Sequence, residues 1–184
     1  MKYVLKKTPL DGLVIFEFEN SKNFSEFSDE SFSQRSFNEA INSNQYKFVQ
    51  DNQSKSIKNV LRGMHYQIQN PQGKLVRVLS GSVFDVAVDL RKKSKTFCQW
   101  FGFELNSKSS TQIWIPPGFA HGFLVLSETA EILYKTTDYW YPEHERTLLW
   151  SDTDIDIKWP TFSAPILAQK DSEGTSFINA EVYD

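Results

Sequence analysis

The chain reads Ser82-Val83-Phe84-Asp85-Val86-Ala87-Val88-Asp89-Leu90, and this stretch decides its fold. Residues two apart point to the same face of a β-strand. Phe84, Val86, Val88 and Leu90 therefore share one face, and Val83, Asp85, Ala87 and Asp89 share the other. Such a run predicts a strand between a core and a second layer or water.

The same period of two continues on both sides of this stretch. Ser80-Gly81 separates it from residues 74–79, which predicts a hairpin. Residues 106–110 form a polar break, and Pro116-Pro117-Gly118 forces a tight bend. Further alternating runs contain Phe97, Phe101, Phe103 and Leu105; Ile113 and Ile115; Phe123 and Val125; and Ile132, Tyr134 and Thr136.

Only residues 33–41 indicate a helix. Phe37 and Ile41 are spaced to share one helical face, and Ser36 with Glu39 resembles a capping box. Many short strands with one short helix predict an all-β sandwich or jelly-roll barrel. We expect one domain over residues 1–184, with N-terminal strands and helix in 1–45, the barrel in 46–159 and an irregular tail in 160–184 that packs over the barrel.

The composition excludes several classes of protein. The chain has 184 residues, 40% hydrophobic and 15% aromatic, with a formal net charge of −3. These values indicate a globular domain and provide no basic excess for nucleic acid or an anionic membrane. Cys98 is the only cysteine, the first residues lack a signal-peptide core, and the apolar runs are too short to cross a bilayer. We therefore expect a reducing, cytoplasmic location.

Several catalytic motifs are missing. The chain contains no G-x-G-x-x-G fingerprint, no phosphate-binding P-loop and no G-x-S-x-G elbow. This argues against a dinucleotide enzyme and a serine hydrolase. Cys98 is expected in an apolar, aromatic strand, so we interpret it as a core thiol rather than a nucleophile.

Two of the three histidines, His65 and His121, lie beside strong local motifs. A zinc or iron site needs three or more converging ligands. Metal-binding jelly rolls usually carry an H-x-H pair, whereas the second position here is Gln67. We therefore predict no metal, and keep a metal-dependent barrel as an alternative.

Proton chemistry is the other use of such a histidine. A histidine can remove a proton from a carbon beside a carbonyl, a carboxylate can orient it, a tyrosine can return a proton, and a cation can stabilise the enolate. His65, Asp171, Tyr134 and Lys74 are the candidates for these roles, but a structural role for His65 is as compatible with its spacing. Arg62 and His65 would face opposite sides of a regular strand, unless a bulge at Gly63 turns both inward.

These residues belong to segments that resemble the dTDP-4-dehydrorhamnose 3,5-epimerase family. The likeness runs from about Phe48 to Asp171. Its most specific segments are residues 48–52, 60–65, 72–77, 83–91, 113–126, 133–137 and 141–146. The resemblance implies a cupin-type jelly roll, a homodimer, no cofactor, and inversion at C3 and C5 of a dTDP-4-keto-6-deoxy-hexose.

The resemblance also assigns roles to residues. It implies His65 as the base, Asp171 as its carboxylate partner, Tyr134 as the acid, and Lys74 and Arg62 as cations near the sugar and enolate. It implies an aromatic that stacks on the nucleotide base at Tyr139. The other implied substrate-binding residues are Gln50, Asn52, Glu30, His121, Glu145 and Lys170.

One segment departs from the family pattern D-x-R-G-x-F-x-E. Glu30 matches the final glutamate, but Ser25 replaces the arginine and Glu26 the glycine. A lost cation beside an added carboxylate weakens contact with an anionic nucleotide, unless Lys22 compensates. A mono-epimerase or keto-isomerase on a related nucleotide sugar and a non-catalytic sugar-binding barrel therefore remain alternatives.

Overall fold

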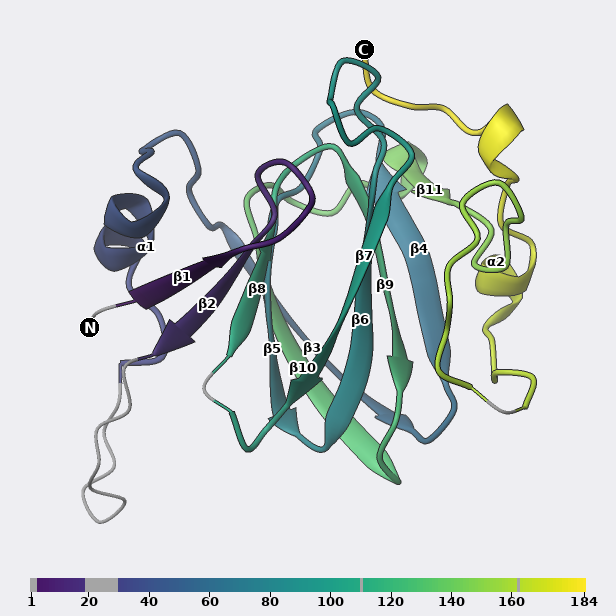
Figure 1. Ribbon diagram of the computed structural model, residues 1–184, viewed down its shortest axis with the longest axis horizontal. Helices are drawn as coiled ribbons and strands as arrows, with labels where there is room; N and C mark the ends of the chain where they lie inside the picture. Colours follow the sequence, from purple (N-terminus) through teal and green to yellow (C-terminus); the bar gives the residue numbers. More distant parts are fainter. Residues whose placement is uncertain (1–2, 19–29, 110, 162) are drawn as a thin grey trace.

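Two antiparallel β-sheets face each other in the computed structural model, which describes residues 3–18, 30–109, 111–161 and 163–184 (Figure 1). The six-stranded sheet has the order β1 (Tyr3–Lys7), β2 (Val14–Phe18), β8 (Gln112–Ile115), β5 (Lys74–Ser80), β10 (Thr129–Thr136), β3 (Gln50–Ile57). The five-stranded sheet has the order β11 (Glu145–Thr147), β4 (Leu61–Gln67), β9 (Phe119–Val125), β6 (Ser82–Asp89), β7 (Trp100–Asn106). The predicted mainly-β jelly-roll class is confirmed. That residues 1–184 form one domain with three parts stays a prediction.

Both faces of strand β6 are buried, which explains why apolar residues occur at both parities of its sequence. Val83 and Ala87 lie in the core between the sheets, whereas Val86 and Val88 pack into a second cluster outside the five-stranded sheet. Burying apolar surface is the main term that favours folding, so a strand covered on both sides needs apolar residues at both parities.

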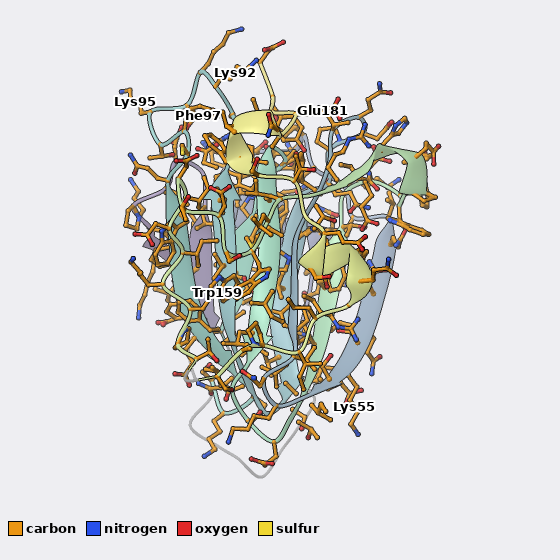
Figure 2. All side chains as sticks on the ribbon, turned by 90° about the vertical axis from the view of Figure 1, so that its right-hand side faces the viewer. Lys55, Lys92, Lys95, Phe97, Trp159 and Glu181 are labelled. Carbon is orange, nitrogen blue, oxygen red and sulfur yellow. The ribbon has the colours of Figure 1, made fainter. Side chains whose placement is uncertain are left out.

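The C-terminal part of the chain forms the outer layer against this sheet, as the sequence predicted. Phe177, Ala180, Val182 and Tyr183 are partly buried against Val86, Val88 and their neighbours. Figure 2 looks onto this side, with Trp159 near the middle of the face and Phe97 and Glu181 towards one end.

Helix α1 (Gln34–Ile41) covers the outer face of the other sheet. Phe37 is fully buried against Phe16, Phe48 and Trp114, and Ile41 packs against the same cluster, as their spacing predicted. The predicted capping box was wrong. Ser33 and not Ser36 is the N-cap, and its hydroxyl accepts from the backbone N–H of Ser36, so the helix begins within the predicted range of residues 33–41.

The predicted hairpin between residues 74–79 and 82–90 was also wrong. Strand β5 pairs with β8 and β10, whereas β6 pairs with β7 and β9 in the other sheet. Gly81, with φ of +77°, lies between the two layers instead of closing a two-stranded ribbon. Alternation reports which face of a strand is buried and carries no information on which strands pair.

Two further local predictions need correction. Cys98 lies in a turn before β7, with φ of +67°, rather than in a strand, although it does pack against the apolar cluster under the tail. The tail also contains a short helix, α2 (Gln169–Ser172), and the 3-10 turns are η1 (Pro142–His144) and η2 (Phe177–Asn179). Four residues are too few for a helical period to be visible in the sequence.

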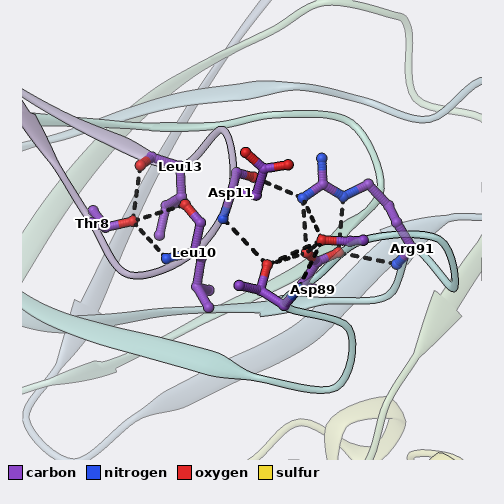
Figure 3. Close-up of polar contacts among 8 residues, drawn as sticks. Thr8, Leu10, Asp11, Leu13, Asp89 and Arg91 are labelled. Atoms are coloured by element: carbon purple, nitrogen blue, oxygen red, sulfur yellow. Dashed lines mark hydrogen bonds and ion pairs between the residues drawn. The ribbon is translucent and has the colours of Figure 1, made fainter.

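A buried carboxylate ties the β1–β2 turn to the loop after β6 (Figure 3). Asp89 is fully buried and accepts hydrogen bonds from Arg91, Ser94 and Thr96. Arg91 also donates to the carbonyl oxygen of Asp11 at 2.7 Å. The alternating strand pattern did not say which face is inward, and the saturated acceptors of Asp89 explain how a charge is tolerated in the interior.

Among the described residues, none of the helices has the length and apolar character that spanning a bilayer requires.

Candidate active site

His65 and Asp171 form the central pair of the candidate site. His65 lies on β4 and Asp171 on α2, and Nε2 of the imidazole lies 2.5 Å from Oδ1 of the carboxylate. Asp171 is 1% exposed, so few groups other than His65 can contact its carboxylate. An ionised carboxylate only accepts, so Nε2 carries the proton and Nδ1 keeps its lone pair. None of the described residues is a hydrogen-bond partner of Nδ1.

Burial lowers the pKa of the His65 imidazole below its ordinary value of 6.5, although the hydrogen bond and charge of Asp171 oppose the shift. The positive charges of Lys170 and Lys74 act in the same direction as burial. A lowered pKa keeps the imidazole neutral at physiological pH, which is the form that can accept a proton.

The bulge that the sequence hypothesis required is present in β4. The pairing of β4 with β9 changes register between Arg62 and His65, and Gly63 has φ of +127°. A Cβ at Gly63 would lie 2.5 Å from the Cα of Gly122, so only glycine fits. Arg62 and His65 both line one cavity of about 520 Å³, and Arg62 is exposed at its surface.

Lys74 begins β5 and is buried in the same cavity. Its Nζ donates to the carbonyl oxygen of His65 at 3.2 Å. Burial lowers its pKa to about 8, and the charges of Glu145 and Asp85 partly offset that effect. An ammonium with this pKa is still mostly charged at neutral pH, so it can stabilise an oxyanion.

Tyr134 enters the cavity from the other sheet. It lies on β10, whereas His65 lies on β4, so the two side chains come from opposite walls. Burial raises the pKa of the Tyr134 phenol, and the charge of Arg62 opposes this shift. The phenol therefore stays protonated and is available as a proton donor.

His121 forms a second histidine–carboxylate pair beside the first. It lies opposite His65 in the β4–β9 pair and lines the cavity. Its Nε2 lies 2.9 Å from Oδ2 of Asp85, which is fully buried on β6. The strand alternation put Asp85 on the same face as Val83 and Ala87, but neither its burial nor its pairing with His121 was predicted.

The structure brings together most of the predicted site. The cavity is lined by ten of the predicted residues: His65, Asp171, Tyr134, Lys74, Arg62, Gln50, Asn52, His121, Glu145 and Lys170. Lys170 Nζ lies 3.2 Å from the carboxylate of Glu145, which connects α2 to β11 at the edge of the cavity. What each residue does there stays a prediction.

Two predicted ligand contacts do not line this cavity. Glu30 is exposed, and Tyr139 is 55% exposed with its neighbour Trp140 in the lining instead. Their contact with a ligand stays a prediction. The changed family positions Ser25 and Glu26, with Lys22, lie outside the described residues.

Sequence reasoning missed several lining residues as site residues, of which Ser54, Gln72, Phe123 and Trp140 are polar or aromatic. Ser54 could have been found by parity, because it follows Gln50 and Asn52 at steps of two along β3. Trp140 follows the end of β10 in an irregular loop, where no periodic signal exists.

The described residues contain no group of three or more His, Cys, Asp or Glu side chains arranged to hold a metal ion. The two histidine pairs each use one ring nitrogen on a carboxylate instead. The absence of a metal from the reaction stays a prediction.

The comparisons with known proteins decide the family. Residues 7–179 match the family described as dTDP-4-dehydrorhamnose 3,5-epimerase. The chain belongs to this family. A dTDP-4-dehydrorhamnose 3,5-epimerase of Pseudomonas aeruginosa is 56% identical to this epimerase over 154 residues, which cover 84% of both chains. One from Shigella flexneri is 48% identical and covers 96% of this chain and 97% of its own.

A solved relative has the same fold as this epimerase. The dTDP-6-deoxy-D-glucose-3,5-epimerase of Legionella pneumophila, in complex with dTDP-4-keto-L-rhamnose, superimposes with a TM-score of 0.92. It is 44% identical and covers 97% of this chain and 95% of its own. The predicted family, the isomerase class and the cupin-like fold are therefore confirmed.

Proposed function

We propose that this epimerase inverts C3 and C5 of a dTDP-4-keto-6-deoxy-hexose by moving protons beside the 4-ketone. The single observation that carries the mechanism is the His65–Asp171 pair, which lines a cavity with the Tyr134 phenol on the opposite wall. A hydrogen on a carbon beside a ketone is acidic because the resulting charge moves onto oxygen. Both C3 and C5 flank the same ketone, so one site can act on each in turn.

In the proposed first step, His65 Nδ1 removes the proton from the carbon. The C–H electron pair forms a double bond to C4, and the carbonyl becomes an enolate. Asp171 stabilises the imidazolium that results, because its carboxylate already holds Nε2 at 2.5 Å. The lowered pKa of His65 keeps the starting base neutral.

Lys74 is the proposed partner of the enolate oxygen. Its ammonium is buried, so the charge acts in a medium that screens it less than water does. A buried cation aimed at developing negative charge lowers the barrier without being rearranged during the step. Arg62, at the cavity surface, is proposed to hold the diphosphate.

Tyr134 is the proposed acid. It gives its hydroxyl proton to the opposite face of the enolate, the ketone re-forms, and the carbon is inverted. The site is left with a phenolate and an imidazolium, and proton exchange with water restores both. Opposite walls are required for inversion, and His65 and Tyr134 lie on different sheets.

Proton NMR in deuterated water tests the reaction. With the dTDP-4-keto-6-deoxy sugar as substrate, we expect deuterium at both C3 and C5. His65→Ala should abolish exchange at both carbons, whereas His144→Ala, outside the cavity, should retain it. Full exchange in His65→Ala, or none in the unmodified protein, would refute the mechanism.

Tyrosine variants test the direction of protonation. Tyr134→Phe should still allow exchange at the first carbon while blocking its inversion, because His65 can return its own proton to the face it came from. Tyr46→Phe, which lies in the cluster under α1, is the matched control.

The changed positions Ser25 and Glu26 favour one second candidate, a mono-epimerase on a related nucleotide sugar. The stereochemistry of the product separates the two: inversion at only one of the two carbons would favour the mono-epimerase.

A homodimer in the cytoplasm completes the proposal. The family resemblance supports the dimer, as do the exposed Val4 and Leu5 on β1, which lies at the edge of its sheet. The single thiol Cys98 supports a reducing compartment. Light scattering of the purified protein measures the oligomeric state, and a single-chain mass would refute the dimer.

A further inference from the structure

We propose that Gln50 is a positioning residue, which orients the side-chain amide of Asn52 so that Asn52 offers an N–H group, and not its carbonyl, to the ligand. The inference rests on the proposed function only for the identity of that ligand, a nucleotide sugar with its oxygens near Tyr134. The orientation itself follows from contacts within the chain.

The argument begins at the backbone of Trp140. Its N–H donates to Oε1 of Gln50 at 3.2 Å. A backbone N–H can only donate, so it must meet the oxygen of the Gln50 amide and not the nitrogen. This contact removes the usual freedom of an amide to be turned by 180°.

The loop around Trp140 is itself held by a buried amide. Gln67, which is 3% exposed, accepts from the backbone N–H of Tyr141 at 2.8 Å and donates to the carbonyl of Tyr139 at 3.2 Å. These contacts hold the residues on both sides of Trp140. The direction of the Trp140 N–H is therefore set by the loop and not by Gln50.

The orientation passes from Gln50 to Asn52. With Oε1 on Trp140, the Nε2 group of Gln50 faces Asn52 and donates to its Oδ1 at 2.8 Å. The carbonyl of Asn52 is then occupied, and its Nδ2 has no hydrogen-bond partner among the described residues. Two successive hydrogen bonds, from the Trp140 N–H to Gln50 and from Gln50 to Asn52, thus fix the orientation of both amides.

The free N–H of Asn52 lies where a ligand oxygen is expected. Asn52 lines the cavity and is directly opposite Tyr134 in the β3–β10 pair. Residues directly opposite on antiparallel strands have side chains about 5 Å apart on one face. Lys74 and Arg62 in the same cavity are also donors, so the wall around Tyr134 selects acceptor oxygens.

Ligand-free NMR tests the orientation first, so that this test does not depend on the proposed reaction. In the ¹⁵N-labelled protein, one Nε2 proton of Gln50 should show slowed exchange with water, which Asn52→Leu should remove. Gln50→Met should shift the Trp140 backbone amide resonance. An unprotected Gln50 amide, or a Trp140 resonance that does not respond, would overturn the inference even if epimerisation is found.

Ligand binding tests the consequence. In Gln50→Glu, one carboxylate oxygen can still accept from Trp140, but the other cannot donate, so Asn52 must turn its carbonyl into the cavity. In Gln50→Met, Asn52 can turn either way. We expect the Kd of the dTDP-4-keto-6-deoxy sugar, measured by calorimetry, to rise about 10-fold or more in Gln50→Glu and by less in Gln50→Met. The variant that keeps the hydrogen bond to Trp140 is thus expected to bind the sugar more weakly than the variant that loses it.

Added charge is controlled by Ser54→Asp, which places a carboxylate on the same face of β3. The inference requires that Gln50→Glu alone removes the ligand-induced shift of the Asn52 side-chain N–H resonances. Equal losses in Gln50→Glu and Ser54→Asp, with that shift intact in both, would overturn it and attribute the loss to repulsion. If the sugar does not bind the unmodified protein while the ligand-free result holds, the proposed function fails and the orientation stands.

Discussion

In the proposed mechanism, the protonation state of His65 sets the acid limit of activity. A base must be neutral to act, so kcat/KM falls when pH drops through the pKa of the folded protein. Burial lowers that pKa below 6.5, so we expect the acid limb of a pH–rate profile to lie below pH 6.5.

Asp171→Asn removes the carboxylate and should lower kcat by about 100-fold to 10,000-fold, as measured under substrate saturation.

In the proposed mechanism, Lys74 sets the alkaline limit, because it must be charged to stabilise the enolate. Its pKa of about 8 is reached before the raised pKa of the Tyr134 phenol, so Lys74 decides the limb. We expect kcat/KM to fall above about pH 8. Lys74→Arg should lower activity through altered geometry but remove this limb, because guanidinium stays charged. An unchanged alkaline limb in this variant would exclude Lys74 from the role.

Strand β4 depends on Gly63. Alanine there would need φ of +127° and would meet the backbone of Gly122 at 2.5 Å. We expect Gly63→Ala to lower the free energy of unfolding by more than about 1 kcal/mol and to reduce activity, since the bulge places both Arg62 and His65. The measurement is urea unfolding together with the epimerisation rate.

Gly102→Ala on β7 is the matched comparison for Gly63. Its Cβ would meet the ring of Phe84, which can turn, and not a backbone atom. We expect the free energy of unfolding to fall in both variants, but only Gly63→Ala should change the candidate active site.

Phe37 is the buried anchor of helix α1. Phe37 is fully buried, with ring centroids 4.9 Å from Phe48 and 5.0 Å from Trp114. We expect Phe37→Ala to cost about 3–5 kcal/mol in urea unfolding, whereas Arg35→Ala on the exposed side should cost little. Equal losses would show that the helix is held by its backbone and not by this contact.

The stability of the whole molecule should depend on pH through Asp89. Burial alone would raise the pKa of its carboxyl, but hydrogen bonds from Arg91, Ser94 and Thr96 outweigh burial and lower it. A lowered pKa means that the unfolded chain binds the proton first as pH falls. The stabilisation is therefore present above about pH 4 and is lost as pH drops through the pKa of the folded state.

Thermal unfolding between pH 3 and pH 7 measures this effect. Asp89→Asn should lower Tm at pH 7 and flatten its decline towards low pH. Asp184→Asn, which removes a carboxylate bonded to Lys92 at the exposed end of the chain, should change neither. An unaltered acid decline in Asp89→Asn would assign the pH dependence to other carboxylates.

Across these scales, the sequence predicted the elements better than their partners. The alternation around β6 correctly identified strands with two distinct faces, and the Phe37–Ile41 spacing correctly identified α1. The hairpin between β5 and β6 was wrong because side-chain parity is a local property, whereas strand pairing depends on contacts far apart in the chain.

The candidate site was likewise predicted only in part. Resemblance named His65, Lys74, Tyr134 and Asp171, and residue chemistry explained why such groups suit proton transfer. Sequence reasoning missed Trp140, because an irregular loop leaves no period in the sequence. It also missed the orientation of the Gln50 and Asn52 amides, because the direction of a side-chain amide leaves no trace in the sequence.

By itself, the sequence determined the class of fold, which residues share a face of each strand, and the residue types available for chemistry, because these depend on local spacing and side-chain character. Only the tertiary structure decided that His65 and Asp171, 106 positions apart, meet at 2.5 Å, and that Tyr134 faces them from the other sheet. The physical reason is that pKa values and hydrogen bonds depend on distance and burial in space, which no spacing along the chain specifies.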